Sequence, residues 1–346
     1  MEILTRDGNK DMTPAMRKPL LRPIAGIALF VGVVVAAAGL VACGAGLCGA
    51  RLALGLTLGT LALQLVPVGA LALPAVVERL RRFLDDRPAR IFVIAAMLFA
   101  PYLLYWTILE NPLQTGVLWL LAWVMAPTAL AVFGPRGDRM VLAGDALVVV
   151  AIWLPYEFHW IQSAYPWPGN GAGSLLSVPL GLGLLVFLTV VVRRMDGVGY
   201  VARIDPNDLM VAARAFGLFA LAGIPIGLLS GFLRPTHRWA GAWEAVARAV
   251  MIFLFTALPE EICFRGLIQK LIERGTGRRG TALAIASILF GLAHLNNGPA
   301  PDWRYALLAT LAGLAYGWTF LKTGRLAAPA LVHMLVDLTW SLAFKG

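Results

Sequence analysis

Long apolar stretches, separated by short polar connections, run through almost the whole chain of 346 residues. A helix that crosses a bilayer needs about 20 mostly apolar residues. By this measure the pattern predicts about eleven spans, with a range of about nine to twelve because short or re-entrant segments blur the count. The expected spans are residues 23–48, 52–77, 91–109, 115–133, 140–157, 174–192, 209–232, 243–264, 281–297, 303–321 and 326–344. The predicted fold is therefore all-α, a polytopic transmembrane helical bundle.

Composition supports this prediction. Hydrophobic residues make up 59% of the chain and charged residues only 14%, whereas soluble domains are about 45–50% apolar and about 25% charged. So much apolar surface cannot be hidden inside a globule of this size. Disordered chains are polar and rich in charge, so disorder is excluded as well.

The net charge of +10 indicates how the chain is oriented. Alternate connections, beginning with the N-terminus, contain 21 of the 29 lysine and arginine residues, and the opposite side contains 6. Cytoplasmic loops carry such an excess of basic residues. We expect an integral protein of a bacterial inner (plasma) membrane, with its N-terminus in the cytoplasm. Because the charge is explained by orientation, no nucleic-acid partner is expected.

A polar, basic segment at 193–208 divides the chain. The expected parts are a basic cytoplasmic tail (1–22), an N-terminal transmembrane region of unknown role (23–200) and a second transmembrane domain (205–346). The first six spans are almost free of ionisable groups. Asp145 is expected to be a charge near the interface, and Glu157, at a span end, is assigned no chemistry.

The three cysteines, Cys43, Cys48 and Cys263, all lie in apolar runs. They do not form the pattern of a disulfide framework or of a cysteine-type zinc site. We expect them to be small buried hydrophobic side chains.

The last five spans contain ionisable residues, which are costly inside a membrane and therefore indicate function. Glu261 and Arg265 are four residues apart, so on a helix they share a face and can pair. Glu260 points about 100° away from Glu261 and lacks that partner. A carboxylate in such surroundings is suited to act as a general base or acid. The alternative is an acidic turn at the membrane interface.

Two further groups contain histidine. His294 follows Phe290 by four residues at the end of an apolar run, and His333 and Asp337 are again four residues apart. Taken alone, His294 could be an ordinary core histidine, and the second pair could brace two helices. Polar residues on separate membrane helices are satisfied most cheaply when they meet in one cavity. A carboxylate, two imidazoles and water in one cavity are suited to hydrolysis.

At these residues the chain resembles the CPBP family of intramembrane proteases (CAAX protease and bacteriocin-processing, Abi), which includes the type II CAAX prenyl endopeptidases. The family pattern is Glu-Glu-x-x-x-Arg, then Phe-x-x-x-His, then His-x-x-x-Asn or Asp, each on its own helix. The resemblance covers about 205–346. It rests, in the same order and spacing, on Glu260, Glu261, Arg265, Phe290, His294, His333 and Asp337.

The resemblance implies a glutamate-type endopeptidase in which Glu260 and His294 activate water. Glu261 and Arg265 would shape the site, and His333 and Asp337 would occupy the oxyanion positions. An ionised Asp337 can only accept hydrogen bonds. It would therefore orient His333 or a water, or act in its protonated form.

No cofactor is expected. The alternative is a zinc ion held by Glu260, His294, His333 and Asp337, which are acceptable ligand types, although the chain has no His-Glu-x-x-His pattern. The expected partners are the lipid bilayer and a membrane-anchored protein or peptide substrate, with or without a lipid attached.

Two other functions are compatible with these residues. One is a non-catalytic, membrane peptide-binding or immunity protein. The other is a transporter with a proton relay, which the lack of repeated halves disfavours.

Overall fold

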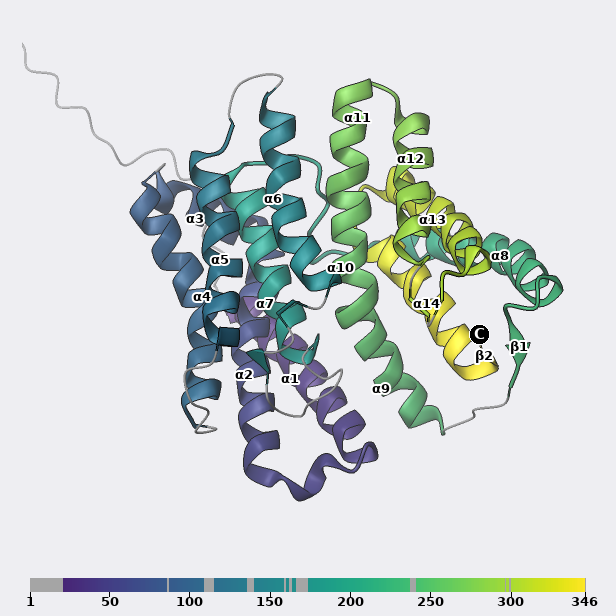
Figure 1. The fold of residues 1–346 in the computed structure, drawn as a ribbon, viewed down its shortest axis with the longest axis horizontal. Coiled ribbons are helices and arrows are strands. Elements are labelled where there is room, and N and C mark those ends of the chain that lie inside the picture. Colours follow the sequence, from purple (N-terminus) through teal and green to yellow (C-terminus); the bar gives the residue numbers. More distant parts are fainter. Residues whose placement is uncertain are drawn as a thin grey trace, which may run out of the picture.

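The computed structural model describes residues 21–345, apart from 86, 109–114, 136–139, 159, 162–163, 166–173, 237–240, 296 and 299. The predicted basic tail (1–22) lies almost entirely outside the described residues. Helices dominate the described chain (Figure 1).

The first half consists of helices joined by short connections. They are α1 (Leu21–Gly44), the 3₁₀ turn η2 (Leu47–Gly49), α2 (Arg51–Leu71), α3 (Pro74–Leu84), α4 (Pro88–Ile108), α5 (Thr115–Phe133), α6 (Met140–Glu157) and α7 (Ser174–Val186), which continues into the π-helical η4 (Phe187–Val192).

The second half begins with α8 (Pro206–Leu229) and then has one long helix in five parts. These parts are α9 (Ala242–Ile252), η5 (Phe253–Ala257), α10 (Leu258–Glu261), η6 (Ile262–Gln269) and α11 (Lys270–Thr276). The remaining helices are α12 (Arg279–Ala293), α13 (Trp303–Thr323) and α14 (Ala327–Ala343). Two short strands, β1 (Arg234–Pro235) and β2 (Phe344–Lys345), form an antiparallel pair that joins the end of α8 to the C-terminus.

A helix lies at each of the eleven predicted spans, and the prediction of an all-α membrane bundle is confirmed. By length and composition, five helices of the described chain can cross a membrane: Pro23–Gly44, Arg51–Leu71, Gly116–Phe133, Leu175–Val192 and Pro206–Leu229. Shorter apolar helices cover Pro88–Leu103, Arg279–Ala293 and Ala327–Ala343. The β1–β2 pair is the small departure from an all-helical fold.

Helix α3 was not predicted. The expected second span extended to residue 77, but α2 ends at Leu71 and α3 starts at Pro74. A residue before proline avoids the helical conformation, and Leu73 is accordingly extended. Proline is favoured at the first position of a helix. Arg81 of α3 donates to the carbonyl oxygen of Val190 at 2.7 Å, which ties α3 to the end of η4.

Proline also explains the first irregular part of the long helix, η5. Pro259 has no N–H to donate to the preceding turn, and its ring would clash with the carbonyl four residues earlier. The π-helical η5 ends two residues before Pro259, so the backbone widens where this conflict arises. Such π-helical turns are frequent at functional sites.

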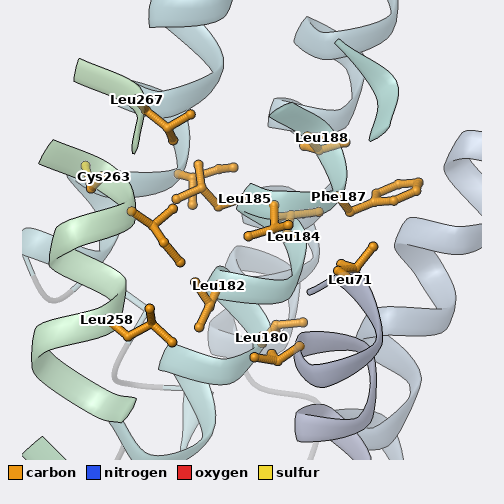
Figure 2. Packing of buried hydrophobic residues seen from close by; sticks show 14 of the residues in the cluster. Leu71, Leu180, Leu182, Leu184, Leu185, Phe187, Leu188, Leu258, Cys263 and Leu267 are labelled. Atoms are coloured by element: carbon orange, nitrogen blue, oxygen red, sulfur yellow. The ribbon is translucent and has the colours of Figure 1, made fainter. Parts of the chain in front are cut away.

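The first seven helices pack on one side of the long helix, and α8 with α12–α14 packs on the other (Figure 1). Between α7 and the long helix the core is leucine-rich, and Leu184, Leu188 and Leu267 are fully buried (Figure 2). The connection at 193–205 is anchored to both groups of helices. Tyr200 donates to the carbonyl oxygen of Val68 at 2.7 Å, and the Leu326 N–H donates to the carbonyl oxygen of Gly199.

The structure gives Asp145 a partner that the sequence did not indicate. Its carboxylate accepts from Arg193 at 2.7 Å, and the two side chains are only 3% and 2% exposed. This buried ion pair joins α6 to the segment after η4. Arg193 is 48 residues away in the sequence, so the pattern around Asp145 gave no sign of it.

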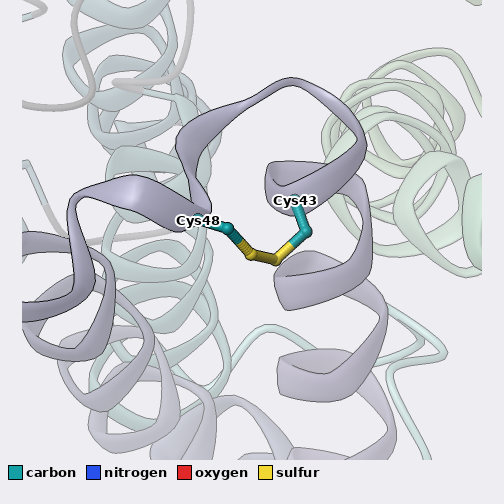
Figure 3. Close-up of a disulfide and its surroundings, with 2 residues drawn as sticks. All are labelled: Cys43 and Cys48. Atoms are coloured by element: carbon teal, nitrogen blue, oxygen red, sulfur yellow. A yellow bond between two sulfur atoms is a disulfide. The ribbon is translucent and has the colours of Figure 1, made fainter.

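The expectation for two cysteines was wrong, because Cys43 and Cys48 form a disulfide (Figure 3). The bond closes the connection between α1 and α2. Only Cys263 is a free, buried cysteine among the described residues. Disulfides persist in oxidising compartments, so this connection is expected on the non-cytoplasmic side, where the distribution of basic residues also places it.

We expect a thiol-reactive maleimide to label only one cysteine in the denatured, unreduced protein, and all three after reduction. Intact-mass spectrometry counts the labels. Labelling of three cysteines without reductant would contradict the disulfide.

Candidate active site

Three helices carry the predicted site residues. The long helix supplies Glu260, Glu261 and Arg265, the end of α12 supplies His294, and α14 supplies His333 and Asp337. Although His294 and His333 are far from Glu260 in the sequence, each ring approaches the Glu260 carboxylate to within 4.0 Å. The structure therefore brings all six residues into one cluster.

Glu261 is the centre of a buried hydrogen-bond network. Its Oε1 accepts from Arg265 at 2.8 Å and from His333 Nδ1 at 2.9 Å. The side chains of Glu261 and Arg265 are fully buried. The pairing expected from their spacing is thus present, and the alternative of an interfacial acidic turn is wrong. The contact with His333 is a tertiary one that spacing does not reveal.

Arg265 is enclosed by aromatic rings and backbone. Its guanidinium carbon lies 4.3 Å from the ring centre of Phe290 and 5.1 Å from that of Tyr316. It also donates to the carbonyl oxygen of Gly313 at 3.3 Å. A Cβ at Gly313 would lie 3.2 Å from the guanidinium. Glycine at this position therefore lets α13 approach Arg265 closely.

The orientation of His333 follows from its contacts. Its Nδ1 donates to Glu261, because a carboxylate paired with arginine only accepts. Its ring stacks on Tyr316, with centres 4.6 Å apart and planes 15° from parallel. The remaining nitrogen, Nε2, faces Asp337 Oδ2 at 3.5 Å and Glu260 Oε2 at 3.8 Å. Glu260 and His333 therefore lie at the same depth.

His294 and Glu260 face each other across a short gap. The Nδ1 of His294 donates to the carbonyl oxygen of Phe290 at 2.8 Å, so the neutral ring presents an unprotonated Nε2. That nitrogen lies 4.0 Å from Glu260 Oε2, an oxygen that is buried without a hydrogen-bond partner in the described part of the chain. One water about 2.8 Å from each atom would span this gap at an angle of about 90°. The geometry therefore allows one shared water.

Two cavities meet at this cluster. A cavity of about 800 Å³, called the chamber below, is lined by Glu260 and His294 on one side and by Trp153, Tyr156 and Glu157 of α6 on the other. A smaller apolar pocket of about 80 Å³ lies between α8 and α12–α14, and His294, His333 and Asp337 reach into it. Helices α5–α7 of the N-terminal region, which the sequence left without a role, thus form one wall of the chamber.

Sequence reasoning missed three residues near the cluster. Tyr305 packs edge-on against His294, with ring centres 5.0 Å apart, and Tyr316 stacks on His333. They are eleven residues apart, about three helical turns, so both lie on one face of α13. That spacing is a signal the sequence contains. Glu157 had no such signal, because only the fold brings α6 to the chamber.

The cluster does not fit a metal ion as it stands. Within the described ranges, no three histidine, cysteine, aspartate or glutamate side chains are arranged to hold one. We therefore derive no step through zinc.

These features describe an integral membrane protein with a buried carboxylate–imidazole cluster. Residues 242–339 match the family model described as "Type II CAAX prenyl endopeptidase Rce1-like". The resemblance expected from the sequence is thereby confirmed for this part of the chain, which begins at α9.

A curated relative supports the same family. "CAAX prenyl protease 2" of Arabidopsis thaliana is 30% identical over 99 residues. The aligned region is 25% of this chain and 32% of the relative, so the chain matches about a third of that protein's length. No solved structure matches the chain.

Proposed function

We propose that the protein is an intramembrane endopeptidase, which hydrolyses a peptide bond of a membrane-anchored protein or peptide. The observation that carries the proposal is the 4.0 Å approach of Glu260 Oε2 to His294 Nε2 at the wall of the chamber. Two basic atoms at this separation can hold one water by both of its protons. Such a water directs a lone pair away from both side chains, toward a substrate carbonyl.

In the proposed reaction, Glu260 removes a proton as the water oxygen attacks the carbonyl carbon. His294 holds the second proton of the water and orients the attack. The protonated Glu260 then gives its proton to the nitrogen of the scissile bond as the C–N bond breaks. The products are a new amine and a new carboxylic acid, which keeps the second proton of the water until it ionises to solvent, and Glu260 returns to its initial state.

The remaining residues of the cluster would stabilise the developing oxyanion and hold the ring of His333 in position. Protonated on both nitrogens, His333 would donate from Nε2 to the developing oxyanion. Glu261 and Arg265 hold its ring through the 2.9 Å and 2.8 Å hydrogen bonds. Asp337 would orient His333 from the other side, as its 3.5 Å distance from Nε2 allows.

The substrate proposed is membrane-anchored, with or without a lipid. The printed name of the Arabidopsis relative makes a prenylated protein one candidate class. The proposed location is a bacterial inner membrane with a cytoplasmic N-terminus, which the distribution of lysine and arginine supports.

The test is cleavage of candidate membrane peptides by the full-length protein in detergent. The wild type should cut a peptide that the His294→Ala variant cuts far more slowly, because the variant cannot hold the water. Mass spectrometry of the fragments gives the rate. Equal rates for the two proteins would rule out the proposed role of His294, and binding without any cleavage would favour a peptide-binding protein.

We further propose that hydrolysis needs no metal ion. Incubation with a chelator, followed by its removal, should leave the cleavage rate of the wild type unchanged. The cleavage rate is measured before the chelator treatment, after it, and in a third sample to which zinc is added after the treatment. Loss of cleavage that zinc restores would overturn the metal-free mechanism and favour zinc at Glu260, His294, His333 and Asp337.

A further inference from the structure

The chamber lies toward one face of the membrane. The basic face is defined by α3 and the connections at 193–205, 276–279 and 323–327. The disulfide face is the opposite one, defined by the α1–α2 connection that contains Cys43 and Cys48. Helix α12 starts at the basic face and has only 15 residues, so it is about 22 Å long. This length is less than the hydrocarbon thickness of a bilayer, about 30 Å. It ends at Ala293, next to Glu260, and α6 also ends beside α10 (Figure 1).

The lining of the chamber follows these helix ends. Phe158, just after α6, and Asn297, just after α12, lie at its rim, and both are exposed. His294 is the first residue beyond α12. Phe158, His294 and Asn297 therefore line the chamber where α6 and α12 end, toward the disulfide face.

The chamber is closed toward the basic face. There the leucine core between α7 and the long helix is tightly packed, and Leu188 and Leu267 are fully buried (Figure 2). Beyond this core, the buried Asp145–Arg193 ion pair joins α6 to the segment that follows η4. A polypeptide that entered from the basic face would have to displace both the leucine core and this ion pair.

Two features identify the disulfide face as the non-cytoplasmic one. A disulfide between Cys43 and Cys48 requires an oxidising environment. Described basic residues of α3, of the connection at 193–205 and of the α11–α12 turn lie on the other face, as expected for a cytoplasmic surface.

The shape of the chamber indicates what enters. Its wall is largely apolar, with Trp153 of α6 packed edge-on against Phe264 at 5.9 Å. Its polar side chains include Glu157, Glu260, His294 and Asn297. The small apolar pocket adjoins the same His294 and has room for an aliphatic side chain. An extended polypeptide offers both kinds of group, a polar backbone and alternating side chains.

We propose that the chamber opens to the non-cytoplasmic face and receives the juxtamembrane segment of an exported, membrane-anchored protein. The assignment of this segment as substrate rests on the proposed peptidase function. The direction of opening does not, because it depends only on the helix ends, the packed core and the disulfide. Helices α5–α7 would then select the substrate, since they build the wall that faces Glu260.

Cysteine labelling tests the direction of opening. In a full-length Cys263→Ala background, Asn297→Cys places a thiol at the chamber rim, and Thr276→Cys places one at the exposed basic end of the long helix. A membrane-impermeant maleimide should label Asn297→Cys equally in intact and permeabilised spheroplasts. It should label Thr276→Cys only after permeabilisation. The reverse pattern, or no labelling of Asn297→Cys in either sample, would overturn the proposal.

A second measurement tests the substrate class. Protein termini are compared by mass spectrometry in membranes from cells that express the wild type or Glu260→Gln. Termini that depend on Glu260 should lie in non-cytoplasmic segments of membrane-anchored proteins, and their confinement to cytoplasmic segments would overturn the proposal. A complete lack of such termini would contradict the peptidase function, while the labelling result would still decide the direction of opening.

Discussion

Replacing Arg265 by methionine should lower the free energy of unfolding in detergent by about 3–5 kcal/mol, the usual cost of removing one partner of a buried ion pair. Arg265 is fully buried, and Glu261 would lose its strongest partner while remaining buried. The contacts of the guanidinium with Phe290 and Gly313 would also be lost. The free energy of unfolding is obtained from the helical circular dichroism signal, which is measured as the denaturant concentration increases.

A matched control lies on the same long helix. Glu244 and Arg248 have the same spacing and a 2.6 Å contact, but their side chains are 54% and 33% exposed. An exposed pair contributes about 0–1 kcal/mol, so Arg248→Met should change the free energy of unfolding by no more than that. Equal losses in the two variants would show that burial of Arg265 does not stabilise the fold.

The double variant Glu261→Gln/Arg265→Met removes both charges. It should recover part of the stability lost in Arg265→Met, because no uncompensated carboxylate remains. His333 would still have a hydrogen-bond acceptor at position 261, the amide oxygen of glutamine.

Replacing the neighbouring Glu260 by glutamine should slow catalysis without lowering the stability of the fold, unlike the replacement of Arg265. Its Oε2 has no hydrogen-bond partner among the described residues, so the change should not lower the free energy of unfolding. It should lower kcat about 10²–10⁴-fold, the usual contribution of a general acid or base. Glutamine keeps the size of the side chain but cannot take a proton from water.

The control for this variant is Glu244→Gln, which removes a carboxylate from the exposed end of the same helix and should keep the wild-type rate. Rates come from initial velocities of peptide cleavage in detergent, and unfolding curves are recorded on the same samples. Wild-type kcat in Glu260→Gln would exclude Glu260 as the base.

Much of this architecture could be predicted from the chain itself. Bilayer thickness imposes the length of each apolar stretch, so a helix lies at every predicted span. The four-residue spacing of Glu261 and Arg265 led directly to their ion pair, since helix geometry is local. Because buried charges are costly in a membrane, the positions of the polar residues indicated where the cluster would form.

Other features depend on contacts that local spacing cannot contain. The hydrogen bond from His333 to Glu261 joins residues 72 positions apart. Asp145 and Arg193 are likewise distant in the sequence, so the expectation for Asp145 did not include its partner. The disulfide was missed for a different reason, because two cysteines in an apolar run are as compatible with burial as with a bond. The chamber wall formed by α6 and α7 also depends on tertiary packing.

The most direct test of the central claim is a double-mutant cycle for kcat with Glu260→Gln, His294→Ala and their combination. If both residues hold one water, either substitution already loses that water. The double variant should then be about as slow as the slower single variant, as found for residues that act as a unit. If the two losses instead multiply in the double variant, Glu260 and His294 act independently, and the shared-water mechanism is contradicted.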